Sequence, residues 1–134
     1  MASLPPRPRL AIVNTSEDLI EVLTTFFEEE GYDVASAIVR SFRTNEKDLK
    51  QFIAAHDPQV LVWDIALPYE ENWSYFERVR QSPVMKGRRF VLTTTNEKRV
   101  REVAQPDEEL TEIVGKPFDL RQLADAVKRA RKAP

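Results

Sequence analysis

The sequence predicts an α/β fold with a doubly wound, five-stranded parallel sheet. Five short apolar stretches alternate with segments whose apolar residues recur at helical spacing, which is typical of successive βα units. The stretch at residues 60–65, VLVWDI, is too short for a buried helix and too apolar for a surface strand, so it indicates a strand covered on both faces. With 134 residues and no repeat or linker, the chain suits a single domain, which we place at residues 9–132.

The N-terminal third begins with an irregular segment and continues as strand, helix and strand. Residues 1–8 contain three prolines, which cannot donate ladder hydrogen bonds, and we expect a disordered lead-in there. Residues 9–13 predict the first strand. Ser16 is a favourable N-cap for the first helix, and we expect Gly31 to end that helix in the left-handed conformation. Residues 32–37 predict the second strand.

The middle of the chain places two more helical segments around the buried strand. Residues 38–46 include a stretch too polar for a core strand, and we expect an extended loop there. Thr44 or Asn45 is the expected N-cap of the second helix, and Asp57, which precedes a proline, ends it. After the buried strand, apolar residues at helical spacing predict a third helix that ends near Ser82.

The C-terminal third predicts two strands and two helices. The strands are expected at residues 90–93 and 111–114, with a short, strongly charged helix between them at residues 96–105. A turn at residues 115–118 precedes the last helix, in which Asp119 and a glutamine three residues later form a capping box. This order gives five helices for five strands.

Composition narrows the classes of function. The 20 basic and 22 acidic side chains give a net charge of −2, which argues against a nucleic-acid partner. The chain has no cysteine and one histidine, His56, which we place at a solvated helix end, so the usual zinc ligands are missing. The three glycines are too far apart for a phosphate-cradling loop. No apolar run approaches the roughly 18 residues of a membrane span, and we expect a cytoplasmic protein with no membrane partner.

Three polar residues stand at the ends of the last three predicted strands. Asp64 follows the most apolar stretch, Thr93 ends the fourth strand, and Lys116 follows the fifth. An acid at the carboxyl end of a buried parallel strand lies where open α/β sheets bind their ligands. Each residue also has a structural interpretation, in which Asp64 forms a turn, Thr93 fills a strand position and Lys116 lies on the surface.

Three short motifs carry a resemblance to a known family. These motifs are D-x-x-x-P at residues 64–68, LTT at residues 92–94 and GKPF at residues 115–118. With the order of elements, they resemble the receiver domain of bacterial two-component response regulators over residues 9–132. The resemblance implies a flavodoxin-like, three-layer αβα fold with strand order 2-1-3-4-5 and a site at the carboxyl edge of the sheet. It also makes the peptide bond between Lys116 and its proline a candidate for the cis form.

The resemblance implies a role for each residue of the predicted site. Asp64 matches the aspartate that accepts a phosphoryl group from a histidine kinase or a phosphotransfer protein. Thr93 matches the switch hydroxyl that hydrogen-bonds this group. Lys116 matches the lysine that pairs with the acceptor carboxylate. A carboxylate suffices as the nucleophile because in-line phosphoryl transfer depends on positioning and charge neutralisation.

The sequence departs from this family at the two acids that follow the first strand. Members of the family carry two adjacent carboxylates there, which bind Mg²⁺ with the acceptor, and here these positions are Asn14 and Thr15. Mg²⁺ prefers anionic oxygen ligands, so we expect weak binding, through Asp64 and the backbone carbonyl of Ala66 if it occurs. We expect Lys116 to pair with Asp64 directly. Substitute carboxylates could come from Glu17, Glu70 or Glu71.

Two smaller departures concern the helix after the acceptor and the fifth strand. Asn72 stands where the family usually has a glycine before its third helix, and we expect it to keep a left-handed turn, which asparagine tolerates. Ile113, three residues before Lys116, replaces an aromatic residue that rotates on activation in many receivers. We therefore expect the rotation of a ring in response to phosphorylation to be absent or altered in this chain.

Two functions remain open, and neither is enzymatic. The first is a stand-alone receiver in a phosphorelay, phosphorylated at Asp64 with a weakened Mg²⁺ dependence, whose output passes through a downstream protein partner. The second is a degenerate receiver that binds its partner without phosphorylation. A phosphatase of the haloacid dehalogenase type needs an acid where Ala66 stands. By analogy with the family, Arg99, Arg101 and the last helix could form a homodimer.

Overall fold

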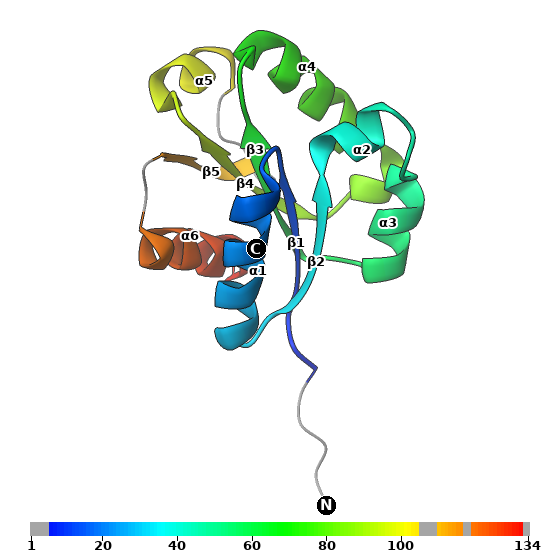
Figure 1. The fold of residues 1–134 in the computed structure, drawn as a ribbon, viewed down its shortest axis with the longest axis vertical. Helices are drawn as coiled ribbons and strands as arrows, with labels where there is room; N and C mark the ends of the chain where they lie inside the picture. Colours follow the sequence, from blue (N-terminus) through cyan, green and yellow to red (C-terminus); the bar gives the residue numbers. More distant parts are fainter. Residues whose placement is uncertain (1–5, 105–109, 117–118, 133–134) are drawn as a thin grey trace, which may run out of the picture.

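Five parallel strands form one sheet, in the order β2-β1-β3-β4-β5 (Figure 1). The computed structural model describes residues 6–104, 110–116 and 119–132. The strands are β1 (Arg9–Asn14), β2 (Asp33–Ile38), β3 (Val60–Ile65), β4 (Arg89–Thr94) and β5 (Leu110–Gly115). The doubly wound fold and the strand order expected from the resemblance are both confirmed.

Helices cover both faces of the sheet and give three layers (Figure 1). The α1 and α6 helices pack on one face, and the others pack on the opposite face. The helices are α1 (Glu17–Glu29), α2 (Val39–Arg43), α3 (Leu49–His56), α4 (Tyr69–Arg80), α5 (Glu97–Val103) and α6 (Leu120–Lys132), with a 3₁₀ turn η1 (Pro83–Met85). Among the described helices, none is long and apolar enough to cross a membrane.

The β3 strand is buried along its whole length, as its sequence predicts. Its side chains alternate between the two faces, so that Leu61, Trp63 and Ile65 join one apolar cluster. Val60 and Val62 join the cluster on the opposite face. The strand therefore delivers its one acid to the edge of a sheet that is covered on both sides.

Residues 38–46 correct the expected extended loop. Residues 39–43 form the short helix α2, because Val39 and Phe42 are three positions apart and both are buried. The ring of Phe42 lies 5.4 Å from that of Phe52 and 6.5 Å from that of Trp63, measured between centroids. The described part of the chain thus has six α-helices, where the sequence predicted five.

The expected caps are confirmed at two helices and wrong at a third. The Ser16 hydroxyl accepts a hydrogen bond from the Leu19 amide at 3.2 Å, and Asp119 Oδ1 accepts one from the Gln122 amide at 2.6 Å. The cap of α3 is Asp48, whose Oδ1 accepts from the Gln51 amide at 3.1 Å. Thr44 and Asn45 instead end the unexpected helix α2. The expected end of the charged helix, at residue 105, lies outside the described residues.

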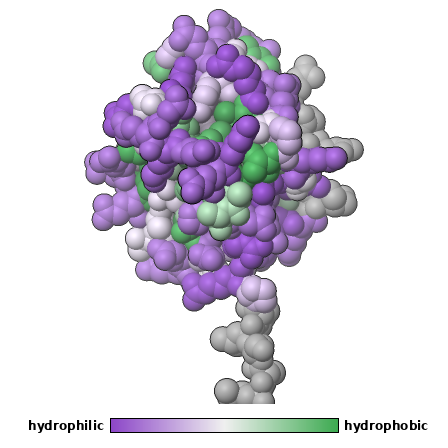
Figure 2. Space-filling model, turned by 90° about the vertical axis from the view of Figure 1, so that its right-hand side faces the viewer, coloured by the Kyte–Doolittle hydropathy of each residue, from purple (hydrophilic) through white to green (hydrophobic). Residues whose placement is uncertain are grey.

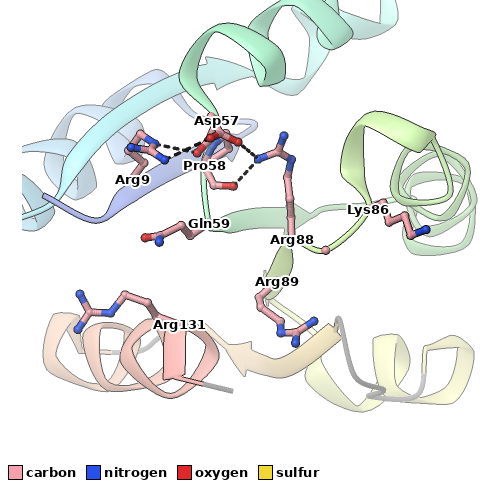
Figure 3. A pocket seen from close by; sticks show the side chains of 9 residues that line it. Arg9, Asp57, Pro58, Gln59, Lys86, Arg88, Arg89 and Arg131 are labelled. Atoms are coloured by element: carbon pink, nitrogen blue, oxygen red, sulfur yellow. Dashed lines mark hydrogen bonds and ion pairs between the residues drawn. The ribbon is translucent and has the colours of Figure 1, made fainter. Parts of the chain in front are cut away.

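Arginines fix the turn before β3, at the edge of the sheet opposite the strand carboxyl ends (Figure 3). Asp57 ends α3, as expected, and it does so in a left-handed conformation with a φ of 47°. Its carboxylate pairs with Arg9 at 3.2 Å and with Arg88 at 2.7 Å. Arg88 also donates to the carbonyls of Pro58 and Val84. A pocket of about 380 Å³ lies at this place. The residues that line it include these ion-paired side chains, which hold three loops together and so have a structural role.

Candidate functional site

Asp64, Thr93 and Lys116 meet at the carboxyl edge of the sheet. Asp64 on β3 and Thr93 on β4 are register partners, and the Thr93 hydroxyl donates to Asp64 Oδ1 at 2.7 Å. The Lys116 ammonium lies 2.7 Å from the same oxygen. Its position is fixed because its backbone amide donates to the carbonyl of Thr94, at the end of β4, at 2.6 Å. The three residues that the sequence singled out therefore form one cluster.

The carboxylate at the centre of this cluster is nearly inaccessible. Asp64 has 4% of its surface exposed and Thr93 has none, whereas the Lys116 side chain is 20% exposed. A buried carboxylate is costly unless it is paired and hydrogen-bonded. Lys116 and Thr93 meet this need on Oδ1, with bonds as short as charge-assisted hydrogen bonds usually are. The expected direct pair between Asp64 and Lys116 is present.

The other carboxylate oxygen faces the end of β1. The Thr15 hydroxyl donates to Asp64 Oδ2 at 3.3 Å, which is a longer bond than those on Oδ1. Asn14 is buried, and its Oδ1 accepts from the amides of Thr15 and Ser16 at 2.7 and 3.1 Å. Within the described part of the chain, the Asn14 Nδ2 atom is buried without a hydrogen-bond partner. Asn14 and Thr15 therefore present hydrogen-bond donors, not anionic oxygens, at this edge.

The loop after Asp64 is held by a side chain that the sequence placed differently. Asn72 Nδ2 donates to the carbonyl oxygen of Ala66 at 2.8 Å, and Arg43 Nη1 donates to Asn72 Oδ1 at 2.6 Å. The expectation of a left-handed turn at Asn72 is wrong, because α4 begins at Tyr69 and Asn72 lies in its first turn. The Leu67–Pro68 peptide bond in this loop is cis.

The residues at this edge do not fit a Mg²⁺ site. Mg²⁺ requires several hard oxygen ligands in octahedral geometry. The Ala66 carbonyl and Asn14 Oδ1 already accept hydrogen bonds, and the free polar atom of Asn14 is a donor. Among the described residues, no three His, Cys, Asp or Glu side chains lie close enough together to hold a metal ion. Glu70, one of the expected substitutes, is paired with Arg99.

Two residues of the site were missed from the sequence. Arg43 lay in the segment expected to be a loop, so nothing indicated that it reaches Asn72. The Tyr69 hydroxyl bonds the Thr95 hydroxyl at 2.7 Å and joins the loops that follow β3 and β4. Ile113 is buried in the cluster on the α4 face. The cis bond expected after Lys116 involves a residue outside the described ranges.

A family model described as the response regulator receiver domain matches residues 10–128. This match covers most of the chain and includes Asp64, Thr93 and Lys116. Among curated proteins, none matches the sequence closely enough to count as a relative.

Solved structures of similar fold include a sensor protein from Polaromonas sp. JS666, at 20% identity and a TM-score of 0.74, covering 94% of this chain and 97% of that chain. A signal receiver domain of a two-component histidine kinase from Clostridium thermocellum is 18% identical with a TM-score of 0.71, covering 93% and 98%. The chemotaxis protein CheY4 of Vibrio cholerae is 16% identical with a TM-score of 0.68, covering 92% and 98%. At these identities the likeness concerns the fold.

Proposed function

Because this chain belongs to the response regulator receiver domain family of two-component signalling, we propose that it is a stand-alone receiver in a phosphorelay, with Asp64 as its phosphoryl acceptor. Its phosphoryl donor is a histidine kinase or a phosphotransfer protein, and its output passes through a downstream protein partner. Its dependence on Mg²⁺ is weakened relative to the family.

The observation that carries this proposal is the set of donors around Asp64. Lys116 and Thr93 hold Oδ1 at 2.7 Å, and Thr15 holds Oδ2 at 3.3 Å. Phosphoryl transfer places new negative charge where the acceptor meets the phosphorus atom, and the protein's task is to neutralise that charge. An ammonium and two hydroxyls are already in place for that purpose.

The geometry favours Oδ2 as the attacking atom. Oδ1 has two short bonds, whereas Oδ2 has one longer bond, to the Thr15 hydroxyl. In the proposed step, Asp64 Oδ2 forms a bond to phosphorus while the bond from phosphorus to the donor histidine nitrogen breaks. The leaving imidazole takes up a proton. The Lys116 ammonium and the hydroxyls of Thr93 and Thr15 then face the phosphoryl oxygens.

Phosphoramidate, a small donor with a P–N bond like that of phosphohistidine, tests this proposal. After incubation with phosphoramidate, intact mass spectrometry is expected to show one phosphoryl adduct on the wild-type protein and none on Asp64→Asn. That substitution keeps the size of the side chain, and its amide oxygen can still accept a hydrogen bond from the Thr93 hydroxyl. An adduct of equal yield on Asp64→Asn would remove Asp64 from the role of acceptor.

A second candidate function is a binding module that works without phosphorylation. The specific observation in its favour is that both oxygens of Asp64 are engaged inside the protein, with no fitting metal site beside them. In that case, the wild-type protein gives no adduct with phosphoramidate, and Asp64→Asn leaves the affinity for the partner unchanged.

The homodimer expected through α5 and α6 stays a prediction. The arginines that would form it are engaged within the chain, since Arg99 pairs with Glu102 at 2.8 Å and Arg101 with Glu97 at 3.4 Å. A dimer would have to exchange these exposed pairs, each worth roughly 1 kcal/mol or less, for contacts with the second copy. Sedimentation velocity across a range of concentrations measures whether it forms.

A further inference from the structure

We propose that the groove between α2, the start of α3 and α4 is a docking site for an acidic segment of a protein partner. The groove has a volume of about 660 Å³. It lies on the side of the molecule that faces the viewer in Figure 2, where apolar areas are surrounded by hydrophilic ones. This surface is distinct from the carboxyl edge of the sheet, and the proposal does not depend on phosphorylation of Asp64.

Four cationic side chains form the rim of the groove. They are Arg43, Lys47, Lys50 and Arg78. Within the part of the chain that the structure describes, none of the four has a carboxylate partner. Several exposed arginines elsewhere on the surface are paired with acids, as in the pairs of Arg121 with Glu30 and Arg129 with Glu112. The rim therefore gathers four cations without a direct ion pair on a chain whose net charge is −2.

The one acid that lines the groove does not neutralise this charge. Asp48 Oδ1 caps α3 by accepting from the Gln51 amide at 3.1 Å. Burial raises the pKa of the Tyr75 hydroxyl at this place, while the charges of Arg43 and Arg78 act to lower it. Arg43 Cζ lies 4.9 Å from the centre of that ring. The Arg43 guanidinium is thus held over one partly buried aromatic ring.

The floor of the groove is apolar. Leu49 and Tyr75 are partly buried against the cluster on the α4 face and line the groove between the cations. Apolar area in the middle of a charged rim is the arrangement of a protein interface, in which a buried anchor supplies affinity and the rim charges select the partner. The fitting occupant is a segment that carries carboxylates on either side of one or two apolar side chains.

A nucleic acid fits the groove less well than an acidic peptide. Glu70 and Glu71 lie on the far side of Arg43 and Arg78, where they line an adjoining hollow. A continuous phosphate backbone that crossed the rim would meet these acids, and nucleic-acid sites depend on an extended basic surface. A short acidic segment that ends within the groove avoids them.

The groove is also connected to the loop that follows Asp64. Arg43 lines the groove and donates to Asn72 Oδ1 at 2.6 Å, and Asn72 in turn holds the Ala66 carbonyl. A carboxylate that binds the remaining N–H groups of Arg43 would therefore contact the same guanidinium that orients Asn72.

The test uses a fluorescein-labelled synthetic peptide, Glu-Asp-Phe-Glu-Asp-Leu-Glu, and fluorescence anisotropy with the full chain. Two matched peptides serve as controls, one with lysines in place of the acids and one with alanines in place of the phenylalanine and leucine. We expect the first peptide to bind and both controls to bind at least about tenfold more weakly, since they lack the charge or the anchors.

Charge reversals on the protein locate the binding site. The double variant Lys50→Glu with Arg78→Glu is expected to lose at least about tenfold in affinity for the acidic peptide. Lys86→Glu with Lys98→Glu, which makes the same charge change at exposed residues outside the groove, is expected to bind within about twofold of the wild type. Circular dichroism confirms that each variant is folded.

Several outcomes overturn the proposal. These are no binding of the acidic peptide at millimolar concentration, equal loss of affinity in both double variants, and equal binding of the alanine peptide. Tighter binding of a single-stranded RNA than of the acidic peptide at the same ionic strength also overturns it, and assigns the groove to a polyanion instead. None of these outcomes depends on whether Asp64 accepts a phosphoryl group.

Discussion

The side-chain amide of Asn72 donates a hydrogen bond of 2.8 Å to the backbone carbonyl of Ala66, two residues after the proposed acceptor. This contact engages the backbone oxygen that a metal ion beside Asp64 would need. Together with the neutral side chains of Asn14 and Thr15, it leaves the described residues of the site poor in metal ligands for two independent reasons.

Restoring the acids is therefore expected to recover only part of the Mg²⁺ affinity. The double variant Asn14→Asp with Thr15→Asp gains two anionic ligands and is expected to bind Mg²⁺ in isothermal titration calorimetry, where the wild type is expected to give little heat. Adding Asn72→Ala frees the Ala66 carbonyl. Because a hydrogen bond contributes roughly 0.5–1.5 kcal/mol, the triple variant is expected to bind about two- to tenfold more tightly.

The control for this series is Asn72→Ala alone, which frees the carbonyl without adding an anion and is expected to bind no Mg²⁺. If the two acids fail to create any binding, the lost carboxylates are not the cause of the defect. Equal affinities of the double and triple variants would show that the Asn72 contact has no effect on the metal.

Removing Lys116 is expected to destabilise the fold. Lys116→Ala leaves the Asp64 carboxylate buried beside the Thr93 and Thr15 hydroxyls without its ammonium partner. Breaking a buried pair costs about 3–5 kcal/mol, and we expect the lower end because the Lys116 side chain is 20% exposed. Urea unfolding measures the change, with Lys98→Ala as the matched surface control.

The double variant Asp64→Asn with Lys116→Ala separates this pairing from general loss of packing. Since no charge is then buried, its free energy of unfolding is expected to lie closer to that of the wild type than Lys116→Ala does. Additive effects of the two substitutions would contradict the coupling between Asp64 and Lys116.

The ion pairs of Asp57 with Arg9 and Arg88 are expected to make the free energy of unfolding depend on pH in the acid range. Arg88 in the first place, and Arg9 in the second, hold the pKa of the Asp57 carboxyl below its ordinary value of 3.8. A carboxyl with a lowered pKa in the folded state contributes stability above its unfolded pKa, and this contribution is lost as the pH falls towards the folded value.

Asp57→Asn removes this contribution at every pH while keeping a residue that tolerates the left-handed φ of 47°. The free energy of unfolding, measured by urea from pH 6 to pH 3, is therefore expected to differ between wild type and variant above pH 4 and to converge below it. A difference that stays constant across this range would show that the charge of Asp57 is not involved.

The effect of substituting Phe42 on the free energy of unfolding tests whether residues 39–43 are packed as a helix. Phe42→Ala is expected to cost about 3–5 kcal/mol, because the side chain is 5% exposed and contacts the rings of Phe52 and Trp63. Arg40→Ala, at an exposed position of the same helix, is expected to change the free energy of unfolding by less than about 0.5 kcal/mol. Equal, small effects at both positions would indicate an extended loop instead.

The position of Asp64 and Thr93 at the carboxyl edge of the sheet could be predicted from the sequence, because both residues stand at the ends of strands. Asp64 and Thr93 end apolar stretches that are long enough to identify, and parallel pairing then makes them register partners. The strand order came from the resemblance to the receiver family, because the alternation of elements allows several orders.

The hydrogen bonds from Arg43 to Asn72 and from Asn72 to the Ala66 carbonyl, in the loop after Asp64, could not be predicted in the same way. In α2 the apolar signal consists of Val39 and Phe42 alone, which is too short to show a period, so the position of Arg43 was not apparent. The bond from Asn72 to the Ala66 carbonyl depends on where α4 begins. Family analogy assigned a turn to that position, and the structure has the first turn of a helix there.

The most direct test of the account is the rate of phosphorylation of the wild-type chain by phosphoramidate, measured by intact mass with excess Mg²⁺ and with EDTA. Because Lys116, Thr93 and Thr15 surround Asp64 and the residues there do not fit a metal ion, we predict an adduct at Asp64 whose rate differs by less than about tenfold between the two conditions. An adduct that forms only with Mg²⁺, or no adduct in either condition, would contradict the account.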